Sequence, residues 1–108
     1  GIPADSRVML PGYEWLRDEL ASSVGQDRLA KVARLAALSR DAGMPINHLA
    51  LLWCLANPRV STVILGASRV AQLADNLAAL KNREKMTPNL REAIEAIVQN
   101  RPEGPRRF

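Results

Sequence analysis

The sequence has a single cysteine and a single histidine, too few for an internal disulfide or for a zinc site built from these residues. Cys54 has no second cysteine with which to form an internal disulfide, which fits a reducing compartment. Because Cys54 stands in the apolar stretch LALLWCLA, we expect it in the core rather than as a nucleophile. One histidine, one cysteine and scattered carboxylates give no ligand spacing for zinc, so no metal site is expected.

Long apolar runs are also missing. No segment approaches the roughly 20 apolar residues needed to cross a bilayer, so membrane insertion is not expected. No basic segment followed by an apolar one stands at the N-terminus, and a cytoplasmic location is therefore the expectation. The 108 residues are 47% hydrophobic and 24% charged, values that fit part or all of one globular domain.

The net charge is only +4, and part of it lies at the C-terminal end. Arg101, Arg106 and Arg107 belong to RPEGPRRF (101–108), which we interpret as a flexible, solvated basic tail. The tail has neither interleaved aromatics nor a run of like charges, so no nucleic-acid partner is expected.

A helix-turn-helix is the remaining DNA-binding interpretation, because LSRDAGMPINHLALLW has a possible turn at Ala42 and Gly43. After Asn47 and His48, however, the second helix would offer Leu, Ala, Leu, Leu, Trp and Cys. These side chains cannot read base edges, which leaves this interpretation as a remote alternative.

Apolar periodicity predicts several helices. We expect them over 13–20, 27–42, 46–56, 68–80 and 89–99, with loop before residue 13 and a break at 22–25. Gly43 is expected to end the second helix, and Thr87 to cap the last one with Pro88 at its first position. One short β-branched run, 61–65, is apolar on both faces and predicts an interior strand of a parallel sheet.

The segment VSTVILGASRVAQLADN (60–76) is the best candidate for a site. The predicted strand stops at Gly66, and Ser68 is placed to cap the following helix. Simple capping explains this pattern. The alternative is a phosphate bound at the helix N-terminus, with Gln72, Asp75 and Asn76 one or two turns further on and able to reach the same ligand.

The single strand poses a problem, because its N–H and C=O groups need a neighbouring strand and the chain predicts no other. Either it pairs with another copy of the chain, or the chain is the end of a longer protein. The strings GIPADSR, PGYEWLRDEL, LALLWCLANPRVSTVILGAS and QLADN favour the second answer. In this order they resemble the C-terminal part of the aldo-keto reductases, closest to the branch of potassium-channel β-subunits and their bacterial relatives.

The resemblance runs from residue 1 to about 102 and implies an α/β fold, the (β/α)8 TIM barrel. Residues 1–108 would then be the C-terminal part of one such domain. The segment 61–65 would be the eighth strand, 68–80 the eighth helix, and 89–99 an extra helix after the barrel. Residues 1–11 would belong to the long loop that follows the seventh strand.

The resemblance also implies a cofactor, NADP(H), held without a G-x-G-x-x-G loop, and the chain has no such loop. Gly66 and Ser68 would meet the 2′-phosphate, helped by Arg69, and Arg7 would reach the pyrophosphate. The expected cofactor-binding residues are Arg7, Gly66, Ser68, Arg69, Gln72, Asp75 and Asn76. The last three would contact the adenine and its ribose, although the family usually has Glu where Asp75 stands.

The implied reaction is hydride transfer from NADPH to an aldehyde or ketone, with a tyrosine as proton donor. The family's catalytic residues lie in the first half of the barrel, so no catalytic residue is assigned here. Tyr13 is interpreted as a packing residue with its hydroxyl at the surface, and His48 as solvated or capping. The chain alone is expected to be inactive. The alternative is a cofactor-sensing or assembly subunit resembling a potassium-channel β-subunit, and in either case a homo-oligomer is possible.

Overall fold

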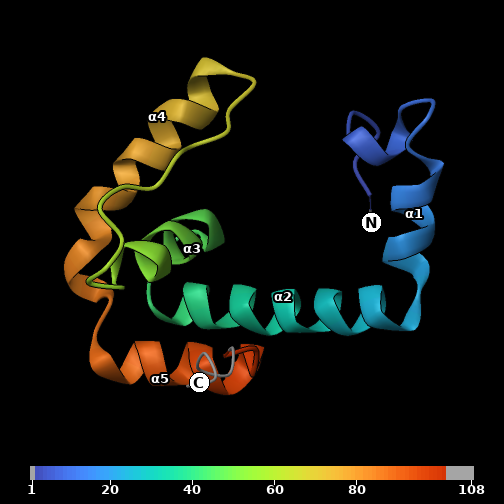
Figure 1. Ribbon diagram of the computed structural model, residues 1–108. Coiled ribbons are helices and arrows are strands. Elements are labelled where there is room, and N and C mark those ends of the chain that lie inside the picture. The colour runs from blue at the N-terminus through green and yellow to red at the C-terminus, as the bar shows by residue number, and fades with distance from the viewer. Residues whose placement is uncertain (1, 102–108) are drawn as a thin grey trace, which may run out of the picture. The chain divides into compact units, whose positions relative to one another are not determined.

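The computed structural model describes residues 2–101, and their regular structure is entirely helical (Figure 1). Five α-helices and two 3-10 segments follow one another along the chain. They are η1 (Arg7–Met9), α1 (Glu14–Ala21), α2 (Ser23–Asp41), α3 (Ile46–Leu55), α4 (Val70–Ala78), η2 (Ala79–Lys85) and α5 (Pro88–Val98). The chain forms two compact units, Gly1–Arg34 and Leu35–Phe108, which are described separately.

In the first unit, the short turn η1 packs against α1. Val8 is buried there, and its carbonyl oxygen accepts a hydrogen bond of 3.0 Å from the Arg17 guanidinium. The expected loop before residue 13 therefore contains one ordered turn.

The corner between α1 and α2 is tighter than expected, since α2 begins at Ser23 and not at residue 27. The Ser22 hydroxyl accepts from the Gly25 backbone N–H at 3.1 Å, which caps the new helix. A side chain at Gly25 would overlap the carbonyl oxygens of Glu19 and Leu20, so only glycine fits this corner.

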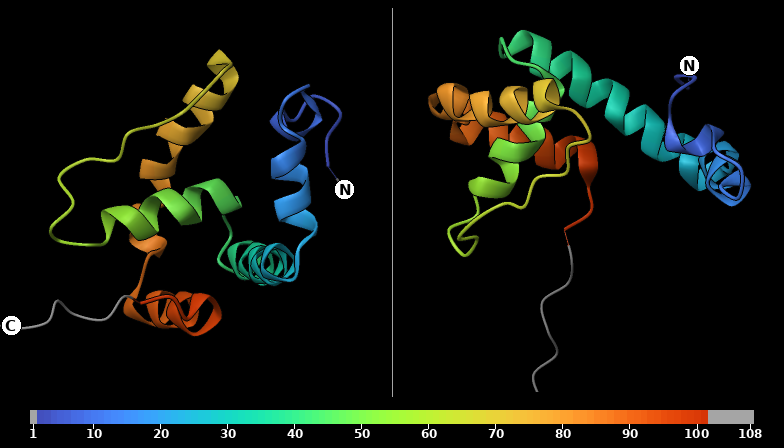
Figure 2. Two further views of the ribbon diagram at one scale, coloured as in Figure 1. Left: turned by 45° about the vertical axis from the view of Figure 1, so that its right-hand side comes forward. Right: turned by 90° about the horizontal axis from the view of Figure 1, so that it is seen from above.

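The second unit is built around α3. Its core consists of Met44, Leu49, Leu52, Leu90 and Ile94, supplied by the turn before α3, by α3 itself and by α5. Leu35 and Leu38 from the end of α2 pack against this core. The segment η2 continues directly from α4, and both contact α3 (Figure 2).

Two predicted helix boundaries are confirmed. Gly43 has φ of +76°, and the Met44 and Gly43 N–H groups donate to the Ser39 and Arg40 carbonyls at 3.0 Å each, the Schellman pattern. The Thr87 hydroxyl accepts from the Leu90 N–H at 3.2 Å at the start of α5, with Pro88 at the first helical position.

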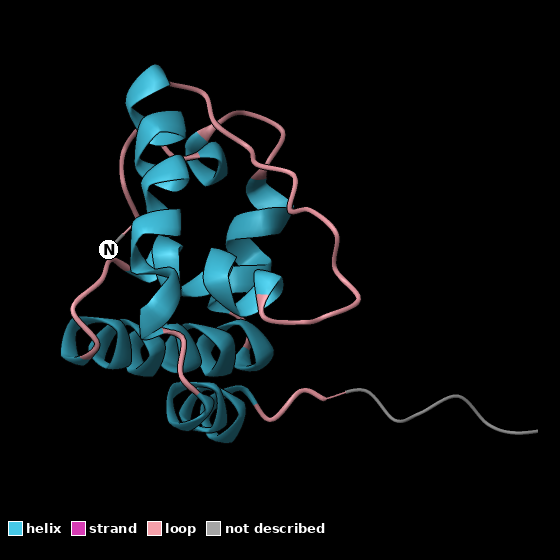
Figure 3. Cartoon of the chain, turned by 90° about the vertical axis from the view of Figure 1, so that its left-hand side faces the viewer, coloured by secondary structure: helices cyan, strands magenta, loops and turns pink. Residues whose placement is uncertain are grey.

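The strand expected at 61–65 is absent from the described residues, which Figure 3 shows as helix and loop only. Residues 57–69 form an irregular connection in which Ile64 is 93% exposed. A strand is defined by hydrogen bonds to a neighbour, and the described residues offer none to this segment. The α/β character implied by the resemblance is therefore not formed within residues 2–101.

Three further expectations change or lie outside the structure. The helix expected over 68–80 is α4, which begins at Val70 and tightens into η2 after Ala78. Cys54, expected in the core, is exposed because it points away from the buried side of α3. Of the tail 101–108, all but Arg101 lies outside the described residues. None of the helices described has the length and apolar character of a membrane span.

Candidate functional site

Three hydrogen-bond donors converge at the N-terminus of α4. The Ser68 N–H, the Ser68 hydroxyl and the Arg69 N–H all point to one atom, Gln72 Oε1, at 2.9, 3.1 and 3.2 Å. The convergence arises because the chain turns at Gly66–Arg69 just before the helix begins, and Gln72 lies one turn further along α4. Gln72 Oε1 thus accepts three hydrogen bonds from donors that lie at the positive end of the helix dipole.

Ser68 was expected to be the N-cap of this helix, and that prediction is wrong. Arg69 occupies the cap position, and the first intrahelical bonds run from the Gln72 and Leu73 N–H groups to the Arg69 carbonyl. Gln72, the N3 residue, reaches back over one turn, and its Oε1 accepts from the N–H of the N-cap residue Arg69, as in a capping box. Within residues 2–101, no acceptor meets the N–H groups of Val70 and Ala71.

The turn before α4 is open to a ligand. Gly66, Ala67, Ser68 and Arg69 are all exposed. A side chain placed at Gly66 would meet nothing within 4 Å, so the space beside this backbone is empty of protein. The turn therefore presents exposed polar donors beside a cationic side chain, an arrangement that suits an anion.

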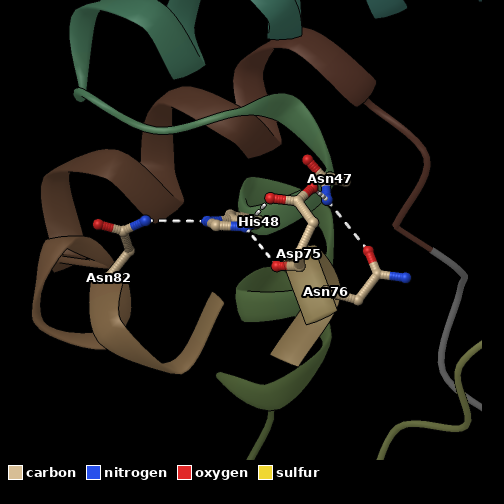
Figure 4. Close-up of polar contacts among 5 residues, drawn as sticks. All are labelled: Asn47, His48, Asp75, Asn76 and Asn82. Atoms are coloured by element: carbon tan, nitrogen blue, oxygen red, sulfur yellow. Dashed lines mark hydrogen bonds and ion pairs between the residues drawn. The ribbon is translucent and has the colours of Figure 1, made fainter. Parts of the chain in front are cut away.

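Asp75 and Asn76, expected to contact adenine and ribose, are both held by α3 (Figure 4). The side-chain amide of Asn47 donates to Asp75 Oδ2 at 2.7 Å and to Asn76 Oδ1 at 3.0 Å. Asn47 stands in the first turn of α3, which places it beside the middle of α4. The structure therefore connects the two ligand-binding candidates through a residue that the sequence reasoning did not assign to the site.

His48 lies next to this pair but is buried, which corrects the interpretation of a solvated or capping side chain. Its Nε2 is 2.7 Å from the Asp75 carbonyl oxygen, and its Nδ1 is 2.9 Å from the Asn82 side-chain nitrogen. The neutral tautomer with the proton on Nε2 satisfies both partners, since Nε2 donates and Nδ1 accepts. His48 thus links α3 to α4 and η2, and neither ring nitrogen is left for a substrate.

Three further residues considered in the sequence analysis, Arg7, Arg69 and Tyr13, lie at or near the surface. Arg7 is exposed in η1 of the first unit, and Arg69 is exposed at the cap of α4 in the second. Tyr13 is half-buried at the start of α1, with its ring centroid 6.4 Å from that of Trp15. A cleft of about 790 Å³ in the second unit lies between α3 and α5 and includes none of the expected cofactor-binding residues.

Sequence reasoning missed Asn47 and Asn82. A signal for Asn47 was present, because Asn47 and His48 are the only polar residues in the otherwise apolar helix INHLALLWCL. Polar side chains in such a helix need partners when they are buried. The side chains of Asp75 and Asn82 could not be identified as neighbours of α3 without the packing of α4 and η2 against it.

Comparison with known proteins now decides the family. Residues 6–98 match the model of the aldo/keto reductase family. The chain belongs to the aldo/keto reductase family. It is also 40% identical over 101 residues to the probable voltage-gated potassium channel subunit beta of Oryza sativa subsp. japonica. That match covers 94% of this chain and 30% of the relative, so the chain spans less than a third of the relative's length.

The family match confirms the resemblance drawn from the sequence. The fold of this family is the TIM barrel. Family membership also implies a nicotinamide nucleotide as cofactor. The residues at the start of α4 fit the phosphate of such a nucleotide, because exposed N–H and hydroxyl donors already converge on one acceptor there. Asp75 and Asn76 fit a base with both donor and acceptor atoms.

Proposed function

We propose that this chain supplies the adenosine and 2′-phosphate end of the NADP(H) site of an NADPH-dependent carbonyl reductase. The observation that carries the proposal is the convergence of the Ser68 and Arg69 donors at the N-terminus of α4. These donors now meet a neutral amide oxygen. A phosphate oxygen bears negative charge and accepts the same hydrogen bonds more strongly, aided by the helix dipole.

The charge of the 2′-phosphate distinguishes NADP(H) from NAD(H). Arg69 places a permanent positive charge beside the turn, and the Val70 and Ala71 N–H groups have no acceptor within the described residues. Gly66 leaves room for the phosphate to approach the backbone. For Arg7, in the first unit, we propose the role that the family resemblance implies, a contact with the pyrophosphate.

When bound, NADPH supplies the hydride that reduces an aldehyde or ketone. We assign no proton donor within this chain. His48 has both ring nitrogens occupied, and Tyr13 packs beside Trp15 in the first unit. We expect no carbonyl-dependent loss of NADPH absorbance with the purified chain, and a measurable rate would contradict that expectation.

Calorimetric titration with NADP⁺ and NAD⁺ tests the proposed site. The unmodified chain should bind NADP⁺ about tenfold or more tightly than NAD⁺, since a charge-assisted contact contributes at least 1.4 kcal/mol. Arg69→Gln should remove most of that preference. Arg59→Gln is the matched control, because Arg59 is an exposed arginine outside the turn, and it should leave the preference unchanged. Equal binding of the two nucleotides, or none, would contradict the proposal.

A second role is supported by the rice relative, whose name describes it as a potassium channel subunit. By this proposal the protein senses a bound cofactor or takes part in assembly, and homo-oligomers are expected. Sedimentation of the chain at rising concentration tests self-association.

Salt-sensitive binding to duplex DNA would instead support the remote helix-turn-helix alternative, in which α3 would have to offer Ala50 and Cys54 to the bases. We place the protein in the cytoplasm.

A further inference from the structure

The cleft between α3 and α5 offers a site for a second kind of ligand. All the residues that line it belong to the second unit, and its volume of about 790 Å³ lies in the range of small-molecule pockets. None of the residues assigned to the nucleotide is among them. A ligand of this cleft would therefore be recognised by other side chains.

One part of the cleft lining is apolar and is held in place by the core. Trp53 and Val98 line the cleft, and both also pack against the buried cluster that contains Leu52. Pro58 and Val60, which follow α3, add two more apolar side chains. The indole ring of Trp53 packs favourably against another aromatic ring, either stacked or edge to face. This part of the cleft therefore suits the flat apolar body of an aromatic compound.

The polar part of the lining is rich in hydrogen-bond donors that lack an acceptor. Arg91 and Arg101 line the cleft, and among residues 2–101 neither guanidinium forms an ion pair. Asn57 Oδ1 accepts from the Arg59 N–H at 3.0 Å, and no acceptor in the same part of the chain meets the Asn57 side-chain nitrogen. Donors of this kind, two of them cationic, favour an anion.

The charge of the lining favours an anion with a single charge. Glu95 also lines the cleft, one turn after Arg91 on α5, so two arginines and one glutamate leave a net charge of +1. A phosphate monoester, with a charge of about −1.5 to −2, exceeds this balance. A carboxylate matches it, and the two carboxylate oxygens accept a paired hydrogen bond from one guanidinium.

We propose that this cleft binds an aromatic carboxylate, with the ring against Trp53 and the carboxylate at Arg91. The site goes beyond the proposed function and does not depend on it, because the two sets of residues have no member in common. Arg69→Gln should therefore leave the binding of the carboxylate unchanged, and Arg91→Gln should leave the preference for NADP⁺ unchanged.

Calorimetric titration of the full chain with 2-naphthoate tests the proposal. The neutral analogue 2-naphthylmethanol should bind about tenfold more weakly, the effect of losing one charge-assisted hydrogen bond. Decanoate, which has the carboxylate but no ring, should also bind more weakly than 2-naphthoate. Arg91→Gln should weaken 2-naphthoate about tenfold. Arg40→Gln is the matched control, because Arg40 is an exposed arginine of α2 that does not line the cleft, and it should leave the affinity unchanged.

Cys54 locates the bound compound, because it lines the cleft and is the only cysteine of the sequence. Its alkylation by the neutral reagent iodoacetamide should slow several-fold when 2-naphthoate is saturating. Binding that leaves the alkylation rate unchanged would overturn the assignment to this cleft. Decanoate bound as tightly as 2-naphthoate, an unchanged affinity in Arg91→Gln, or no binding of 2-naphthoate to the folded chain would overturn the proposal as well.

Discussion

Helices α3 and α4 both carry several apolar side chains, but those side chains have opposite surroundings. In α3, Leu49 and Leu52 are each only 2% exposed. In α4, Val70 is 85% exposed and Leu77 is 55% exposed. Both helices were predicted from the sequence, 46–56 as apolar nearly all round and 68–80 as amphipathic, but neither pattern says what covers the apolar side chains.

The difference follows from what packs on each helix. The apolar side of α3 meets the turn at Met44 and the buried side of α5, both within the second unit. The apolar residues of α4 meet no comparable layer in the part of the chain that is described. In a TIM barrel the helices cover a ring of strands, and residues 2–101 contain no strand. The leucines of α3 therefore lie in a core formed within the described residues, whereas several apolar side chains of α4 remain uncovered there.

The largest expected effect tests this contrast directly with one leucine from each helix. Leu52→Ala should lower the free energy of unfolding by about 2 to 5 kcal/mol, because it removes a fully buried side chain and leaves a cavity. Leu77→Ala should cost less than about 0.5 kcal/mol, because Leu77 is more than half exposed. Urea denaturation followed by circular dichroism gives both values. Similar losses in the two variants would show that α4 is buried in solution.

A smaller effect compares the two helix starts that carry a hydroxyl. Thr87→Ala should cost about 1 kcal/mol, because the Thr87 hydroxyl caps α5 through the Leu90 N–H. Ser68→Ala should cost only a few tenths of a kcal/mol, because Arg69 and not Ser68 is the N-cap residue of α4, and the Ser68 hydroxyl makes only an exposed hydrogen bond to Gln72 Oε1. The same denaturation experiment measures both. A larger loss at Ser68 than at Thr87 would restore the original expectation that Ser68 is the cap.

The smallest effect concerns Glu14 at the start of α1, an exposed group. Hydrogen bonds from the Glu14 and Gly12 backbone N–H groups, with a smaller effect of Arg17, hold the pKa of the Glu14 carboxyl below its ordinary value of 4.5. A depressed pKa stabilises the fold above the unfolded pKa, and this contribution is lost as the pH falls through the folded value. An NMR titration of the Glu14 side chain should give a midpoint below 4.5. A midpoint at or above 4.5 in the unmodified chain would contradict the hydrogen bonds at this helix start.

Local signals in the sequence predicted the helices, and nonlocal contacts explain what was missed. Gly43 and Thr87 act through hydrogen bonds to residues within five positions, so their roles could be read from the sequence. The strand at 61–65 needs partners that residues 2–101 do not supply. The pairing of Asn47 with Asp75 spans 28 positions, and only the packing of α4 on α3 brings the two side chains together.

The central claim, an adenosine 2′-phosphate site at the start of α4, is tested most directly by the amide ¹H–¹⁵N correlation spectrum of the chain with and without NADP⁺. The account predicts dispersed peaks, with the largest shifts at Arg7 and from Gly66 to Asn76. Peaks that do not respond to NADP⁺, or shifts centred on the cleft between α3 and α5, would contradict it.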